Sequence, residues 1–296
     1  MNTSWIRQRS TLVACLCSSV FWSSPRVARA EEPAAPEKER PSVGLSVFHA
    51  FSPTGFVKVR EFQFEGDRLG LRENLGLRSV NALEADGRMP LGPRGALRIL
   101  FQATLFGGDA TLPRDEWFNG TLYQGGGHVD IGSTQYYRGL VLYQHRFVGT
   151  ADPATGRVLG EAGLVLDALD FHIDGPLSPK TVKTEKRENF AKQLLPLPIL
   201  GVTASQPLLR DVRAYGEFRV AFVRALPSFY KEGGTMHFTQ TDLDAILGVA
   251  YRFDPVEAHL AYRQSFFYQE TYSHEDTNQF RLLAQGFELG VAWSPR

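Results

Sequence analysis

Three residue types that serve in hydrolytic triads lie close together near the C-terminal end of the chain: Glu257, His259 and Ser265. An acid, a base and a nucleophile of these types cleave ester bonds when they converge. Their even spacing places all three on one face of an extended strand, where His259 and Ser265 would lie about 20 Å apart. We therefore expect no catalytic residue here and expect His259 to join an ion-pair network.

A second set of side chains, Gln240, Asp242 and Asp244, offers oxygen ligands on one face of a predicted strand. Oxygen ligands suit hard cations such as calcium. Arg252 and other arginines on similar faces give these carboxylates an easier partner. The sequence therefore predicts ion pairs rather than a metal site, and we expect neither a metal nor a cofactor.

These residues belong to segments in which apolar and polar side chains alternate. Between positions 211 and 224, Phe218 and Phe222 share one face, while Glu217 and Arg219 share the other. The same period of two recurs at 94–106, 238–252 and 280–293. This pattern predicts strands with one apolar face and one polar or small-residue face.

The connections between the strands alternate in length. Those near 89–93, 149–156, 207–210 and 253–255 are short, whereas those near 107–127, 175–194, 227–237 and 272–279 are long. Short periplasmic turns and longer external loops are typical of outer-membrane barrels. The sequence thus predicts an all-β fold, a single antiparallel up-and-down transmembrane β-barrel of about ten strands, with eight and twelve left open. We place the strands at 43–66 (one crossing), 78–88, 94–106, 128–148, 157–174, 195–206, 211–226, 238–252, 256–271 and 280–293.

The closing segment, Gly286 to Trp293, alternates apolar residues and ends in an aromatic, although Ser294, Pro295 and Arg296 follow it. With this segment, residues 43–293 resemble Gram-negative outer-membrane β-barrel proteins as a broad class. The resemblance implies a place in the outer membrane and contact with its lipid and lipopolysaccharide. It also implies insertion by the barrel assembly machinery.

The predicted inward faces carry six arginines against seven carboxylates, and the lysines lie mostly in loops. Guanidinium groups suit bidentate pairing with carboxylates. Wide aqueous channels belong to barrels of about 16 strands or more, so this lumen is predicted to be plugged. The expected network includes Arg98, Arg213, Glu217, Arg219, Asp242, Asp244, Arg252, Glu257 and Arg263, with Arg94, Glu161, Asp167 and Glu288 on the same faces.

Residues 1–30 read as a secretory signal peptide for Sec export, with a small-x-small cleavage site at Ala28 to Ala30. The segment 31–42 is rich in proline and glutamate and is predicted to be a disordered periplasmic linker. Removal of four leader arginines leaves 28 basic against 32 acidic residues, which argues against a nucleic-acid partner. Both cysteines, Cys15 and Cys17, would leave with the leader.

Two function classes follow from this sequence. The favoured one is a non-enzymatic barrel that is structural or binds a ligand at its external loops, and a narrow passive channel is its variant. The other is a membrane-embedded hydrolase of lipid A or phospholipid. Ligand, substrate and oligomeric state are left open.

Two loop segments carry unusual sequences. The loop at 175–194 is predicted to face outside and to touch anionic surface lipid, because Lys180, Lys183, Lys186, Arg187 and Lys192 outnumber Glu185 and Glu188. The segment from Glu65 to Leu77 repeats Leu-Gly-Leu. Its role is left open, and a glycine-bearing bend at the rim is the simplest interpretation.

Overall fold

The computed structural model describes residues 39–61, 64–150, 155–180, 188–189, 195–227, 237–273 and 277–295. Contacts group Glu37–Arg296 into one compact unit. The expected signal peptide and residues 31–38 of the expected linker lie outside the described residues. Within the described ranges, no helix is long and apolar enough to cross a membrane.

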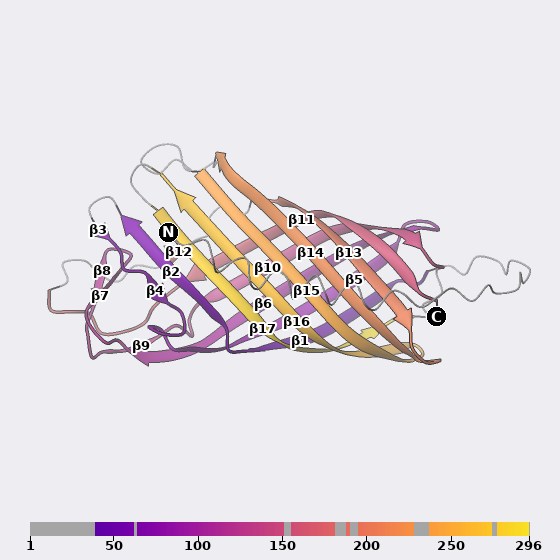
Figure 1. Cartoon of the computed structure of the whole chain (residues 1–296), viewed down its shortest axis with the longest axis horizontal. Coiled ribbons are helices and arrows are strands. Elements are labelled where there is room, and N and C mark those ends of the chain that lie inside the picture. Colours follow the sequence, from indigo (N-terminus) through magenta and orange to yellow (C-terminus); the bar gives the residue numbers. More distant parts are fainter. Residues whose placement is uncertain are drawn as a thin grey trace, which may run out of the picture. The chain divides into compact units, whose positions relative to one another are not determined.

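A closed ring of ten antiparallel strands forms the wall of the molecule (Figure 1). β17 closes the ring, because one half of it pairs with β1 and the other half with β2. The predicted ten-stranded antiparallel barrel is confirmed. Around the ring lie β1 (Ser42–Phe51) with β2 (Thr54–Glu61), β5 (Leu77–Pro90), β6 (Gly95–Thr111), β10 (Gln135–Val148), β11 (Arg157–Phe171), β13 (Leu197–Pro207), β14 (Val212–Pro227), β15 (His237–Phe253), β16 (Val256–Tyr272) and β17 (Thr277–Trp293).

Some predicted boundaries differ from the structure. The crossing predicted at 43–66 breaks at Ser52 and Pro53, because Ser52 has a φ of 58° and proline lacks the amide hydrogen that a ladder needs. The strand predicted at 128–148 divides into β9 (His128–Asp130) and β10, with a turn between them. β9 pairs with an extension of β6, so that β6 runs on into the segment predicted as a loop at 107–127.

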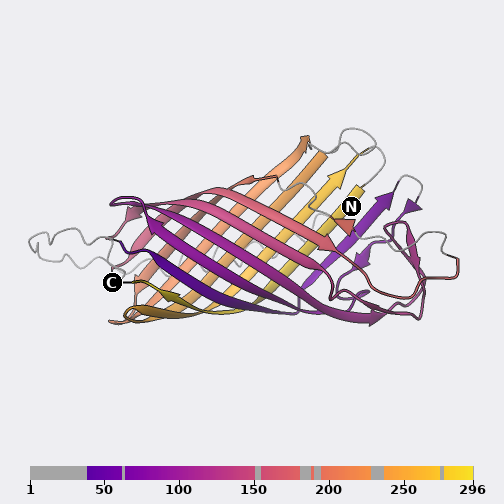
Figure 2. The same cartoon turned by 180° about the vertical axis from the view of Figure 1, so that it is seen from behind.

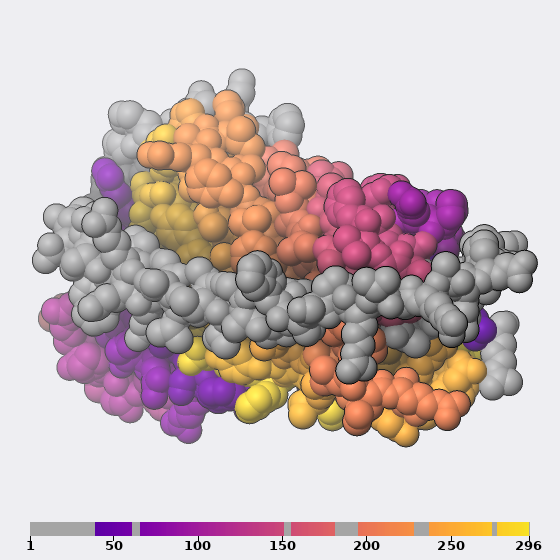
Figure 3. Space-filling view, turned by 45° about the vertical axis from the view of Figure 1, so that its right-hand side comes forward, coloured from indigo at the N-terminus to yellow at the C-terminus, as the bar shows by residue number. Residues whose placement is uncertain are grey.

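Apolar side chains cover the outside of the wall. Leu247 and Leu289 on the outer face are 57% and 65% exposed, whereas Arg219 and Glu288 on the inner face are only 2% and 4% exposed. Pleating sends successive side chains to opposite faces, which explains this division. The outer face also carries Phe101, Val141, Leu164, Leu200, Phe218, Phe222, Val249, Phe287 and Val291. Figure 2 shows the strands from behind, and Figure 3 shows part of the outer surface in space-filling form.

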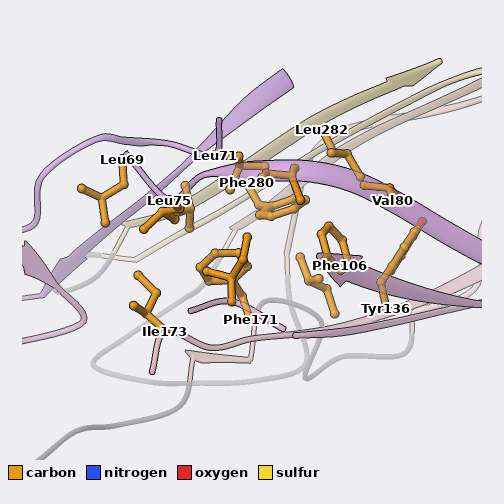
Figure 4. Packing of buried hydrophobic residues seen from close by; sticks show 14 of the residues in the cluster. Leu69, Leu71, Leu75, Val80, Phe106, Tyr136, Phe171, Ile173, Phe280 and Leu282 are labelled. Atoms are coloured by element: carbon orange, nitrogen blue, oxygen red, sulfur yellow. The ribbon is translucent and has the colours of Figure 1, made fainter. Parts of the chain in front are cut away.

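At the end of the barrel opposite the C-terminal end of β17, an apolar plug fills the lumen (Figure 4). Phe280 lies at its centre, with ring centroids 5.7 Å from Phe171, 6.0 Å from Phe267 and 6.5 Å from Phe106. The hairpin of β7 (Glu116–Phe118) and β8 (Thr121–Tyr123) adds Phe118 and Tyr123 to the plug. Short strands β3 (Phe64–Glu65), β4 (Leu69–Gly70) and β12 (Glu188–Asn189) also lie outside the ring.

The Leu-Gly-Leu segment supplies much of this plug. Its four leucines, Leu69, Leu71, Leu75 and Leu77, are at most 1% exposed. A tight turn folds them inward, with the Gly70 amide donating to Asn74 Oδ1 at 2.8 Å. Gly76 has a φ of +65°, and a Cβ there would lie 2.0 Å from the Asp109 carbonyl oxygen, so glycine is required.

Candidate functional site

Charged side chains cross the middle of the lumen in two groups. The first, named here the Arg219 cluster, joins β6 to β14 across the barrel. Arg219 Nε donates to Glu161 Oε2 at 2.7 Å, and its guanidinium also donates to Glu217. Arg98 donates to Glu217 Oε2 at 3.0 Å and to Asp86 Oδ2 at 2.5 Å. Glu217 thus bridges two arginines from facing strands.

The second group, the Arg138 cluster, lies closer to the apolar plug than the first. Arg138 Nη1 donates to Asp244 Oδ2 at 2.5 Å and lies within 3.6 Å of oxygens of Asp167 and Asp242. Arg263 lies 3.3 Å from Asp244 Oδ1. It also donates to Glu84 at 2.9 Å, to Glu288 at 3.0 Å and to Gln102 at 3.0 Å.

Carboxylates outnumber arginines in these two clusters. Arg98, Arg138, Arg219 and Arg263 face Glu84, Asp86, Glu161, Asp167, Glu217, Asp242, Asp244 and Glu288. Neutral donors serve the excess oxygens: Tyr136 donates to Asp167 Oδ1 at 2.6 Å. Gln240 Nε2 donates to Asp167 and Asp242 at 2.7 and 2.6 Å. Buried charges are tolerated when they are paired and hydrogen-bonded in this way.

A cavity of about 230 Å³ lies at the end of the barrel that carries the C-terminal end of β17. Arg213 donates to both Glu257 oxygens at its wall, at 2.5 and 3.0 Å. His259 Nε2 lies 3.4 Å from Glu288 Oε1. Glu39, just before β1, reaches into this mouth and contacts three arginines.

The residues predicted for the lumen network do not all lie together. Arg98, Glu217, Arg219, Asp242, Asp244 and Arg263 belong to the two central clusters, as do Glu161, Asp167 and Glu288. Arg213 and Glu257 form a separate pair in the mouth. Arg252 is 36% exposed and lies 3.6 Å from Asp254, and Arg94 lies in the turn between β5 and β6.

Sequence reasoning missed Arg138, a cation of the central lumen that faces three carboxylates, and also Glu84, Asp86 and Glu39. A signal for Arg138 was present, because it alternates with Tyr136 on one side and Leu140 on the other. Those three side chains are buried, while Tyr137 between them is 42% exposed. Assigning the two faces of the segment 128–148 would have placed Arg138 in the lumen.

The residues considered above for a catalytic triad and for a metal site contact other side chains instead. Ser265 stands opposite Asp244 in the β15–β16 register, whereas His259 stands opposite Ala250, six positions along β15. Glu257 is bound by Arg213, so the three residues do not converge. Asp242 and Asp244 lie beside Arg138. In the described part of the chain, no three His, Cys, Asp or Glu side chains are grouped to hold a metal ion.

Outside the wall, Asp115 fastens two loops at the plugged end. The Gly125 amide donates to Asp115 Oδ1 at 2.7 Å, and Ser178 Oγ donates to Oδ2 at 3.2 Å. The Gly125 hydrogen bond is the main cause that holds the pKa of Asp115 below its ordinary value, with Ser178 and Lys180 adding to it. Nearby, burial raises the pKa of Glu116, although Arg114 donates to it at 3.1 Å.

The ring closure, the apolar outer face and the filled lumen describe one kind of architecture. The fold is a closed, ten-stranded antiparallel β-barrel with an apolar outer face, the architecture that outer-membrane barrels share. No protein-family model matches this chain. No curated protein matches it either.

Several solved structures are similar in fold. The outer-membrane protease OmpT from Escherichia coli is 11% identical, with a TM-score of 0.49, over 86% of this chain and 97% of that one. The translocator domain of the autotransporter NalP from Neisseria meningitidis is 15% identical, with a TM-score of 0.43, over 87% and 90%. The β domain of the Bordetella autotransporter BrkA is 13% identical, with a TM-score of 0.35, over 86% and 100%.

Proposed function

We propose that this protein is a closed, non-enzymatic barrel of the bacterial outer membrane, structural or ligand-binding at its external loops, rather than an open pore. The observation that carries this proposal is the double obstruction of the lumen. The Arg219 and Arg138 clusters fill its middle, and the apolar plug fills one end. A solute would have to displace both.

The outer surface supports the membrane location. Large apolar side chains stand exposed around the wall, which a soluble protein avoids over so large an area. Aromatic residues Tyr251, Phe253 and Trp293 lie exposed at the strand ends next to the mouth cavity, as expected for a membrane interface. With the short turns at this end, it faces the periplasm, and the plugged end faces outside.

A lipid hydrolase is a weaker candidate. It needs a nucleophile and a base within hydrogen-bond reach. In the described residues, Ser265 stands beside Asp244 and His259 beside Glu288. Ser265 and His259 therefore do not supply the nucleophile–base pair that a hydrolase needs.

The test combines location with permeability. Membrane fractionation should find the protein in the outer membrane, with the mobility shift on heating that closed barrels show on gels. Proteoliposomes loaded with the purified barrel should swell in isotonic sugar no faster than empty liposomes. Swelling at the rate of a general porin in parallel liposomes would refute the closed lumen. Recovery in the soluble periplasm would refute the location.

The export signal belongs to the same proposal. Residues 1–30 are proposed to be removed, and the mature protein is proposed to start at Glu31. N-terminal sequencing of the protein from the membrane fraction checks this. An intact leader on the membrane-bound protein would refute the cleavage.

Contact with surface lipid stays a proposal. Of the cations in the loop at 175–194, Lys180 is 80% exposed, and Lys183, Lys186, Arg187 and Lys192 lie outside the described residues. A cysteine at Ser273, labelled in intact cells by an impermeant maleimide, would support the external position of the plugged end. Protection until the outer membrane is breached would invert the topology.

A further inference from the structure

Three arginines from separate strands converge on one carboxylate in the mouth of the barrel. Arg88 of β5 lies 3.0 Å from Glu39 Oε2, Arg146 of β10 lies 3.3 Å from Oε1, and Arg157 of β11 lies 3.6 Å from Oε1. The side chain of Glu39 is 5% exposed, and those of the arginines are 9% to 15% exposed. These four groups are named here the Glu39 site.

The site carries more positive than negative charge. The other contacts of its arginines are neutral: Arg88 Nε donates to Gln144 Oε1 at 2.6 Å, and Arg146 donates to the Pro93 carbonyl. Arg157 Nε is buried without a hydrogen-bond partner. The neighbouring carboxylate Glu257 is bound by Arg213, and Glu161 is bound by Arg219. Three guanidinium groups therefore share the single charge of Glu39.

Glu39 reaches the site on a short arm. It precedes β1 by three residues, a chain length that spans about 10 Å when extended. Arg40, on the same arm, lies 3.8 Å from Asp254 in an exposed pair, which adds little stability. The mouth cavity is lined by Glu39, Arg88 and Arg157, so an anion has a route to the place that the carboxylate occupies.

Guanidinium groups bind carboxylate and phosphate oxygens in the same fork-like geometry. We propose that Arg88, Arg146 and Arg157 form a binding site for a small oxyanion, which the chain's own Glu39 carboxylate fills until its arm withdraws. The ligand class is a phosphate group or a carboxylate. The site is independent of whether the lumen conducts, and it rests on the proposed function only for the side of the membrane that it faces.

The test is titration calorimetry of the detergent-purified full barrel with inorganic phosphate and with acetate at constant ionic strength. Glu39→Ala should bind at least one of the two oxyanions at least tenfold more tightly than the wild type. The oxyanion bound more tightly identifies the ligand class. Adding Arg157→Ala to Glu39→Ala should remove the gain. A folded Glu39→Ala barrel that binds neither oxyanion more tightly would overturn the proposal.

Two controls separate a site from general charge effects. Glu257→Ala removes another carboxylate of the same mouth, but one whose direct ion pair is with Arg213, outside the Glu39 site, and it should give no tenfold gain. An equal gain in Glu257→Ala would overturn the specific site. Glu39→Gln keeps the size of the side chain and removes its charge, so it replaces Glu39→Ala if that variant fails to fold. The tighter oxyanion binding of Glu39→Gln should likewise be lost when Arg157→Ala is added.

Discussion

At the scale of single residues, the lumen shows how this barrel tolerates buried charge. Arg138 is 3% exposed and is the cation nearest to both Asp167 and Asp242. Buried ion pairs are weak evidence of net stability, but removal of one partner leaves the other charge uncompensated. Loss of Arg138 would therefore leave Asp167, Asp242 and Asp244 without this cation.

Arg138→Ala should lower the free energy of unfolding by about 3–5 kcal/mol, the range for breaking a buried pair. Urea unfolding of the barrel in lipid vesicles measures this. Arg78→Ala is the matched control, because Arg78 is 74% exposed and lies 3.5 Å from Asp109. That control should change stability by less than about 0.5 kcal/mol. Similar losses in both variants would contradict the role of the Arg138 cluster.

Residue partners were harder to predict than residue faces. Alternation places Arg219 and Arg263 inside because each strand has only two faces. One partner of Arg263 is Glu84, 179 positions away, and no local sequence pattern indicates a contact over that separation. Arg252 follows the inward phase, but it sits near the end of β15, where its guanidinium reaches solvent and Asp254.

At the scale of elements, the sequence predicts which residues of each strand face outward, but it does not predict the apolar plug. Phe218 and Leu247 have the exposed positions that alternation predicts. The Leu-Gly-Leu segment has no such period, and its leucines are buried in one cluster with Phe171 and Phe280 from distant strands. Only the folded barrel brings those rings together.

Phe218→Arg tests the strand phase. The side chain faces outward near the middle of β14, where an arginine in the bilayer costs roughly 2 to 4 kcal/mol. The variant should fold into vesicles with a clearly lower yield, measured by the heat-dependent shift on gels. Phe218→Leu, which keeps an apolar group, should fold like the wild type. Equal yields for the two variants would place β14 in the opposite phase.

The contacts of Asp115 in the loops at the plugged end should depend on pH. The pKa of Asp115 is lowered in the folded protein. Its contacts therefore stabilise the folded loops fully at pH values above the ordinary aspartate pKa of about 3.9. This stabilisation is lost as the pH falls through the lower pKa of the folded state. Hydrogen exchange measures this: the Gly125 amide should be protected at pH 6. After correction for the intrinsic exchange rate, that protection should be lost as the pH falls below the folded pKa of Asp115.

The same contact can be removed at neutral pH. Asp115→Ala should speed tryptic cleavage after Lys180 several-fold, because the Ser178 and Lys180 contacts are lost together. Asp109→Ala removes an exposed carboxylate of β6 that pairs with Arg78, and it should leave this cleavage unchanged. If both variants are cleaved at the same rate, Asp115 does not fasten the two loops.

At the scale of the whole molecule, the barrel has three successive layers along its lumen. The mouth holds the Glu39 site and the Arg213–Glu257 pair, the middle holds the two charged clusters, and the far end holds the apolar plug. The sequence predicts the charged filling because its inward faces carry opposite charges in similar number. It does not predict the apolar layer, which comes from loops folded back into the ring.

Single-channel recording in planar lipid bilayers tests the closed lumen most directly. The refolded wild-type barrel, shown to be folded by its heat-dependent shift, should give no stepwise conductance above the empty bilayer. A general porin inserted under the same conditions serves as the positive control. Removal of charge alone, as in Arg98→Ala, should leave the barrel silent, because the apolar plug remains. Steady, reproducible conductance steps from the folded wild-type protein would contradict the layered, closed lumen.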